Sequence, residues 1–212
     1  MIQPLDETTL HSASEWLAQR DDALAYVLTH YGYPPLWKRE PDFATLVHII
    51  LEQQVSLASA NVTFRRLQQL VSPLTPEAFS QLSEQALRNA GFSRQKITYT
   101  RHLAWSILRA ELHLSALATL PDEQVRLALK RVKGIGDWTA DIYLSECLLR
   151  PDILPKGDIA MQEAFRRLKA LARRPSPAEF EALTQHWRPW RSVGTRMLWQ
   201  FYLCQKKAQR PE

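Results

Sequence analysis

Glycine is scarce in this sequence, with six in 212 residues, and cysteine is rarer, with only two. Two cysteines cannot supply the four thiolates of an iron–sulfur cluster, and Cys147 and Cys204 each lie in an apolar helical stretch that suits a buried side chain. Without a secretory signal, no structural disulfide is expected. The six histidines lack metal-ligand spacing. No apolar run reaches the roughly 18 residues that would span a bilayer. We therefore expect a cytoplasmic protein with no membrane segment and no metal bound by side chains.

The alternation of polar and apolar residues that marks half-buried strands is also missing. Hydrophobic residues make up 45% of the chain, and many recur at helical spacing. Phe43, Leu46, Val47 and Ile50, for example, fall on one stripe of a helix. The sequence therefore predicts an all-α fold. Its length suits one large domain or two small lobes around a shared cleft.

Capping residues predict where the helices begin. Ser12 and Glu15 form a capping-box pattern, which predicts a helix that starts there and stops at Gly32. The residues at which further helices are expected to start are Asp42, Ser56, Thr75, Ser83, Ser93, Asp158 and Ser176. Pro121 and Asp122 begin the helix that leads into a pair of glycines.

That pair, Gly134 and Gly136, lies in the short run VKGIGDW between two predicted helices. So short a turn predicts a helical hairpin, and glycine supplies backbone angles that a tight turn needs. The first N–H groups of the second helix can then reach a phosphate, with Lys133 adding positive charge and Ile135 anchoring the turn by pointing inward. A net charge of +5 permits a nucleic-acid partner. The bare G-x-G pattern by itself also fits an ordinary αα-hairpin.

The full run LKRVKGIGDWTA, residues 129–140, resembles the hairpin of the helix-hairpin-helix (HhH-GPD) DNA glycosylases. Three further segments resemble family motifs and follow in the family's order: LVHIILEQQVSLASA, ILPKGDIAMQEAF and HWRPWRSVGTRMLW. The resemblance covers about residues 40–205 and is strongest to the 3-methyladenine DNA glycosylase II type, in a compact form without the N-terminal β-rich domain. It implies one glycosylase fold over residues 1–212, with interleaved lobes around a DNA-binding cleft and the hairpin at about residues 122–149.

The resemblance assigns chemistry to four residues. Asp158 matches the family's aspartate, whose carboxylate stabilises positive charge on the deoxyribose and can orient the attacking water. Trp138 stands where strand-cleaving relatives carry a nucleophilic lysine, and indole cannot form a Schiff base. Trp138 and Trp199 match base-pocket residues that would attract a cationic alkylated base through their ring faces, and Tyr143 is a further pocket candidate. The remaining tryptophans are expected in the core: Trp16, Trp37, Trp105, Trp187 and Trp190.

A second group of residues is implied to hold DNA. The hairpin residues are Lys133, Gly134, Ile135 and Gly136. Gln54 occupies the position that fills the gap left by a flipped base, and Ser56 could face the minor groove. Main-chain oxygens of Lys130, Val132 and Ile135 could hold a Na⁺ or K⁺ ion. Arg191, Gly194 and Arg196 are further candidates for phosphate contacts.

Taken together, these features predict a monofunctional glycosylase that flips and excises alkylated purines, such as 3-methyladenine and 7-methylguanine, from duplex DNA. The expected enzyme has no lyase activity and needs no cofactor. It is expected to act as a monomer in the cytoplasm, associated with the nucleoid through DNA. Two alternatives remain open: a non-catalytic helix-hairpin-helix module that binds DNA or senses lesions, and a glycosylase for a neutral damaged base.

Overall fold

The computed structural model describes residues 3–208, which form helices and loops without a strand. The prediction of an all-α fold is therefore confirmed. The chain divides into two compact units, one formed by residues 1–38 with 144–212 and the other by residues 39–143. Among the described residues, no helix combines the length and the apolar character needed to cross a bilayer.

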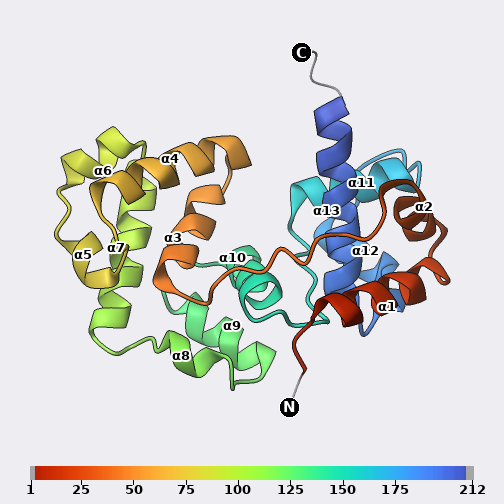
Figure 1. The fold of residues 1–212 in the computed structure, drawn as a ribbon, viewed down its shortest axis with the longest axis horizontal. Helices are drawn as coiled ribbons and strands as arrows, with labels where there is room; N and C mark the ends of the chain where they lie inside the picture. Colours follow the sequence, from red (N-terminus) through yellow and green to blue (C-terminus); the bar gives the residue numbers. More distant parts are fainter. Residues whose placement is uncertain (1–2, 209–212) are drawn as a thin grey trace. The chain divides into compact units, whose positions relative to one another are not determined.

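The first unit, which we call unit 1, is built around the long C-terminal helix. Its elements are α1 (Glu7–Ala18), α2 (Asp22–Tyr31), α11 (Ile159–Leu168), α12 (Pro177–Leu183), the 3₁₀ turn η2 (Gln185–Trp187) and α13 (Arg191–Ala208). Helices α1, α2 and α11 each pack against α13, which is the long blue helix in Figure 1. A buried aromatic cluster of Phe165, Phe180 and Trp187 joins α11, α12 and η2.

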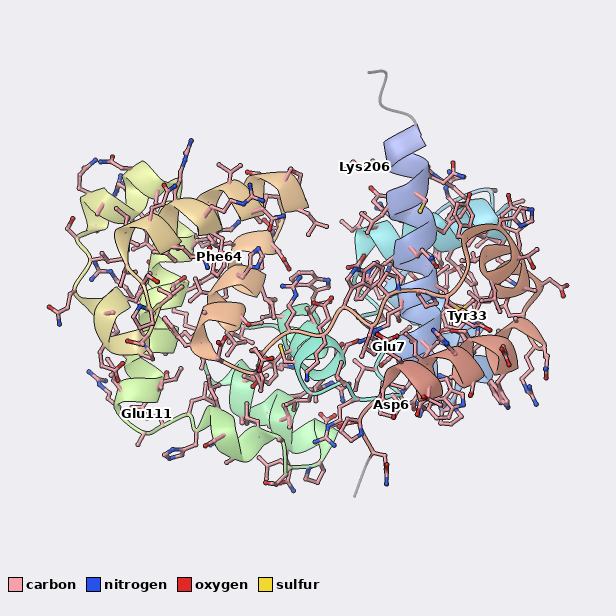
Figure 2. The ribbon with its side chains drawn as sticks, in the orientation of Figure 1. Asp6, Glu7, Tyr33, Phe64, Glu111 and Lys206 are labelled. Atoms are coloured by element: carbon pink, nitrogen blue, oxygen red, sulfur yellow. The ribbon has the colours of Figure 1, made fainter. Side chains whose placement is uncertain are left out.

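The second unit, which we call unit 2, contains the intervening helices. They are α3 (Phe43–Glu52), α4 (Leu57–Leu70), α5 (Pro76–Ser80), α6 (Glu84–Ala90), α7 (Arg94–Leu108), α8 (Leu114–Leu117), α9 (Asp122–Lys130) and α10 (Asp137–Ile142). Phe43, Phe79 and Phe92 form part of its core. Phe64 on α4 is labelled in Figure 2, and its ring stacks on His48 of α3 with centroids 4.3 Å apart. Helix α10 continues into a π-helix, η1 (Tyr143–Cys147), where the chain returns to unit 1.

Most predicted helix starts are confirmed, including Asp42, Ser56, Ser83, Ser93 and the capping box at Ser176. The prediction of one helix between Ser12 and Gly32 is wrong. Asp6 caps α1 by accepting a hydrogen bond from Thr9 N–H at 2.7 Å, and it precedes the first turn of that helix in Figure 2. Asp21 interrupts the run and caps α2. Ser12 lies inside α1, where its hydroxyl donates to the Thr8 carbonyl.

The tryptophans do not all lie where the sequence predicts them. Trp187 is fully buried, and Gly194 of α13 packs so closely on it that a Cβ would lie 2.5 Å from the indole. Trp105 was expected in the core but is 47% exposed. It faces outward because α7 buries the face that carries Ile97, Thr100, Leu103 and Ala104 instead.

Candidate nucleic-acid interface and active site

The hairpin forms as predicted, with α9 ending at Lys130 and α10 beginning at Asp137. Ile135 is 5% exposed, which confirms that it anchors the turn from inside. The Lys130 ammonium pairs with the Asp137 carboxylate across the turn, and this hydrogen bond raises the pKa of Lys130. The Lys133 side chain is exposed. The turn therefore presents positive charge beside the N-terminus of α10, where backbone N–H groups lack partners within the helix.

The two hairpin glycines have different surroundings. Gly134 has a φ of +95°, and a Cβ built on it would lie 2.1 Å from the Tyr99 ring of α7. Gly136 has an extended backbone, caps α10, and would carry a Cβ with nothing within 4 Å. Gly134 is therefore needed for the packing of the turn itself, whereas Gly136 leaves its outer side open to another molecule.

The turn after α3 carries the predicted gap-filling residue. Gln54 is exposed and has a φ of +58°, an uncommon conformation for a residue other than glycine. Its neighbour Gln53 is half-buried, and its side-chain amide donates to the Gly134 carbonyl and to the Thr139 hydroxyl, both at 2.9 Å. Ser56 caps α4 by accepting a hydrogen bond from Ser59 N–H. Gln53 was not among the predicted site residues, because its sequence signal is limited to the doubled glutamine.

The main-chain oxygens proposed for a monovalent cation lie along the same hairpin. The Val132 carbonyl accepts a hydrogen bond from Ile135 N–H at 3.1 Å. A carbonyl oxygen has two lone pairs, so this bond leaves one for a cation. Neutral carbonyl oxygens are suitable donors for a hard cation, and the free lone pair of the Val132 carbonyl is compatible with the ion that the resemblance implies.

Trp138 and Tyr143 follow the hairpin on α10 and at the start of η1. Trp138 is half-buried, so part of its indole is accessible. Tyr143 is fully buried, and its hydroxyl lies 3.4 Å from the Pro41 carbonyl. Within unit 2, Tyr143 therefore packs in the core against the segment before α3 and presents no exposed surface of its own.

Asp158 lies in unit 1 and is the N-cap of α11, as predicted. Its Oδ1 atom accepts a hydrogen bond from Met161 N–H at 2.9 Å, and the side chain remains half-buried. The loop before it is held from inside, because the buried Gln162 side chain donates to the Lys156 carbonyl at 2.6 Å. The carboxylate is therefore held in place at the N-terminus of α11.

Trp199 lies on α13, also in unit 1, and packs partly against the core. Its ring meets Trp37 edge to face, with centroids 6.2 Å apart. Asp158 and Trp199 thus belong to unit 1, as do the phosphate-contact candidates on α13, and the hairpin, gap-filling and remaining pocket candidates belong to unit 2.

Three candidates for phosphate contacts have structural roles instead. Arg196 is fully buried and donates to the main-chain carbonyls of Leu36, Ser145 and Ser192. Arg191 is 8% exposed and makes a two-pronged ion pair with Asp152. Gly194 is covered by Trp187, as described above. Sequence alone could not show that Arg191 and Arg196 are buried, because their partners Asp152 and Ser145 are distant in the sequence.

Comparison with known proteins agrees with this geometry. Residues 47–189 match the family described as HhH-GPD superfamily base excision DNA repair protein. A putative DNA-3-methyladenine glycosylase of Bacillus subtilis is 34% identical over 124 residues, or 58% of this chain and 43% of that protein. The DNA-3-methyladenine glycosylase 1 of Schizosaccharomyces pombe is 27% identical over 172 residues, or 76% of this chain and 72% of that protein. The chain thus spans less than half the length of the Bacillus relative.

Solved structures share the fold. The structure of an S. pombe 3-methyladenine DNA glycosylase in complex with abasic DNA superposes with a TM-score of 0.83 over 95% of this chain and all of that chain, at 23% identity. A DNA-3-methyladenine glycosidase of Bacillus halodurans gives a TM-score of 0.75 over 92% of this chain and 91% of that chain, at 28% identity. The family match covers more than half of the sequence and includes the hairpin and Asp158. The chain therefore belongs to the HhH-GPD superfamily of base excision DNA repair proteins.

Proposed function

We propose that this protein is a monofunctional DNA glycosylase that flips alkylated purines out of duplex DNA and excises them by hydrolysis. The observation that carries the proposal is the Asp158 carboxylate, fixed by its capping bond at the N-terminus of α11 in a chain of this family. The names of the Bacillus and Schizosaccharomyces relatives support 3-methyladenine as a substrate, and 7-methylguanine belongs to the same chemical class.

Hydrolysis breaks the bond between the deoxyribose C1′ and the purine nitrogen. The bonding electrons leave with the base, so a cationic alkylated base departs as a neutral molecule and positive charge develops on the sugar. Asp158 stabilises that charge and accepts a proton as water adds to C1′. Because the leaving group is already activated by alkylation, no strong acid is needed at the base.

Trp138 and Trp199 are proposed to contact the flipped base. An indole face attracts a cation by about 0.5–2 kcal/mol, depending on desolvation, which favours alkylated purines over normal ones. Because Trp138 has no amine that could attack C1′, we propose that the enzyme leaves an intact abasic strand. Tyr143 is proposed to support this region from the core, consistent with its complete burial.

The hairpin is proposed to bind the DNA backbone through the N–H groups around Gly136, with Lys133 adding charge. Gln54 would fill the gap left by the flipped base, and Ser56 would lie near the minor groove. A Na⁺ or K⁺ ion on the carbonyls of Lys130, Val132 and Ile135 would add positive charge next to the phosphate. The proposed partner is thus double-stranded DNA with alkylated bases, bound by a monomer.

The two glycines give a matched pair of variants for the hairpin. Gly134→Ala should lower the free energy of unfolding by about 2 kcal/mol or more, because the new Cβ meets Tyr99 and the residue keeps a positive φ. Gly136→Ala should leave stability nearly unchanged and weaken DNA binding about tenfold, because a methyl group would hold the phosphate away from the backbone. Urea unfolding and fluorescence anisotropy with a labelled duplex measure the two effects. Equal DNA affinity for Gly136→Ala and wild type would contradict phosphate binding at this turn.

The proposed substrate class is tested with duplex DNA treated with a methylating agent. We expect wild-type protein to release 3-methyladenine and 7-methylguanine, identified by chromatography, and to release hypoxanthine from a matched duplex much more slowly. Faster release of the neutral base would make the protein a glycosylase for a different lesion. Tight DNA binding without release of any base would make it a non-catalytic binding module.

A further inference from the structure

The side chain of Gln53 connects two parts of unit 2 that are more than 80 residues apart in the sequence. Its Nε2 atom lies 2.9 Å from the Gly134 carbonyl oxygen and 2.9 Å from the Thr139 hydroxyl oxygen. A primary amide has two N–H bonds, so the two contacts use its full donor capacity. We propose that Gln53 is a positioning residue that fixes the gap-filling turn, residues 53–55, to the phosphate-binding hairpin.

Both acceptors belong to the hairpin. The Gly134 carbonyl is in the turn itself, and Thr139, which is 2% exposed, lies in the first turn of α10. Gln53 therefore holds the hairpin at its tip and at the start of its second helix. Because Gln53 contacts the hairpin at two points, both its distance from the hairpin and its orientation are restrained.

Helix α7 supports the same arrangement from the other side. The Lys96 ammonium donates to the Leu51 carbonyl at 2.6 Å, which holds the last turn of α3. His102 accepts a hydrogen bond from Lys133 N–H at 3.3 Å, and the Tyr99 ring covers Gly134. The end of α3 and the hairpin are thus both attached to α7, and Gln53 is the direct link between them.

The conformation of Gln54 explains why such a link is needed. A non-glycine residue with a positive φ is held there only when its surroundings compensate for the strain. Gln53, the preceding residue, is anchored at its side chain, so the turn cannot relax without breaking both hydrogen bonds. The side chain of Gln54 is therefore presented at a fixed offset from the N–H groups that bind phosphate.

Because Gln54 lies at a fixed distance from the hairpin N–H groups, two steps of DNA recognition are coupled. Once the hairpin has bound the backbone, Gln54 is already placed to enter the base stack, and less conformational freedom is lost when it does so. This inference rests on the proposed function in two respects, namely that Gln54 fills the gap and that the hairpin binds the DNA backbone. The coupling is expected to favour DNA with an empty position in the stack over an intact duplex.

The test compares the affinity for a duplex containing one stable abasic-site analogue with the affinity for the same duplex undamaged. Gln53→Met keeps the length of the side chain and removes both donors, and Gln68→Met on the exposed surface of α4 is the matched control. Loss of two hydrogen bonds should reduce the preference for abasic DNA about tenfold in Gln53→Met, with little change in affinity for undamaged DNA. Gln68→Met should retain the wild-type preference. Gln54→Ala should reduce the preference as much as Gln53→Met does, and the double variant should lose no more than either alone.

Several results would overturn the inference. One is a wild type that does not prefer abasic DNA, or a Gln53→Met variant whose preference for abasic DNA is unchanged. Another is a Gln53→Met variant that loses the same affinity for both duplexes. A third is a double variant in which the losses of preference caused by Gln53→Met and Gln54→Ala multiply. If Gln53→Met melts well below wild type, Thr139→Val is used instead, because it removes one acceptor with little change of shape. Thr139→Val should lose part of the preference for abasic DNA. An unchanged preference in Thr139→Val would also contradict the link. Because the assay measures binding, it separates the two proposals: wild type that prefers abasic DNA through Gln53 but releases no base would refute the proposed catalysis alone.

Discussion

Replacement of Asp158 by asparagine is expected to slow base excision by about 10²–10³-fold while leaving DNA binding within a few-fold of wild type. Asparagine lacks the charge that stabilises the sugar cation and cannot accept a proton from water. Its side-chain oxygen can still accept the hydrogen bond from Met161 N–H, so α11 should remain capped. Single-turnover release of 7-methylguanine measures the rate, and anisotropy with an abasic duplex measures binding.

Asp158→Ala is the companion variant, because it removes both the charge and the cap. It should lose activity as Asp158→Asn does and lose about 1 kcal/mol of stability in addition. Activity near that of wild type in Asp158→Asn would remove Asp158 from the chemistry. A large loss of DNA binding in Asp158→Asn would instead indicate that the residue mainly organises the fold.

The largest effect on stability is expected at Asp21, which is far from the hairpin in sequence. Its side chain is fully buried and accepts hydrogen bonds from Lys169, Trp187 and His186 in addition to capping α2. Asp21→Ala should lower the free energy of unfolding by about 2–4 kcal/mol, because it leaves the buried Trp187 indole N–H without an acceptor and removes the cap of α2. The exposed neighbour Asp22 is the control, and Asp22→Ala should cost less than about 1 kcal/mol.

The contribution of Asp21 should also depend on pH. Burial raises the pKa of Asp21, but the hydrogen bonds from Lys169, Trp187 and His186 outweigh it and lower the pKa below the ordinary value of 3.8. A carboxyl group with a lowered folded-state pKa adds stability above its unfolded pKa, and this stability is lost as pH falls through the folded pKa. The difference in unfolding free energy between wild type and Asp21→Asn should therefore shrink below about pH 4. A difference that stays constant down to pH 2 would contradict an ionised Asp21.

Capping residues made much of the fold predictable from the sequence. Asp42, Ser56 and Ser93 each precede an apolar stripe, and each caps the helix that the pattern predicts. The predicted start at Ser12 is wrong, because a capping-box pattern can also occur inside a helix, and Asp6 caps α1 instead. The short α8 helix has no side-chain cap and was therefore missed.

The candidate site was predictable where the residue type and its local sequence position indicate the role. Asp158 at a helix start and the glycines of the hairpin are of this kind, and the structure gives them the predicted local conformations. Gln53 could not be predicted, because its partners lie 81 and 86 residues away and a glutamine has no preference that indicates them. The buried position of Arg196 was hidden for the same reason, since its partners come from three separate segments.

The most direct test of the proposed activity is a time course with duplex DNA that carries one 7-methylguanine, run with wild type beside Asp158→Asn. Each sample is divided between chromatography for the free base and gels run with and without alkali. The account predicts that wild type alone releases the base and that strand breaks appear only after alkali. Strand breaks without alkali would contradict the monofunctional mechanism, and equal release by both proteins would contradict the role of Asp158.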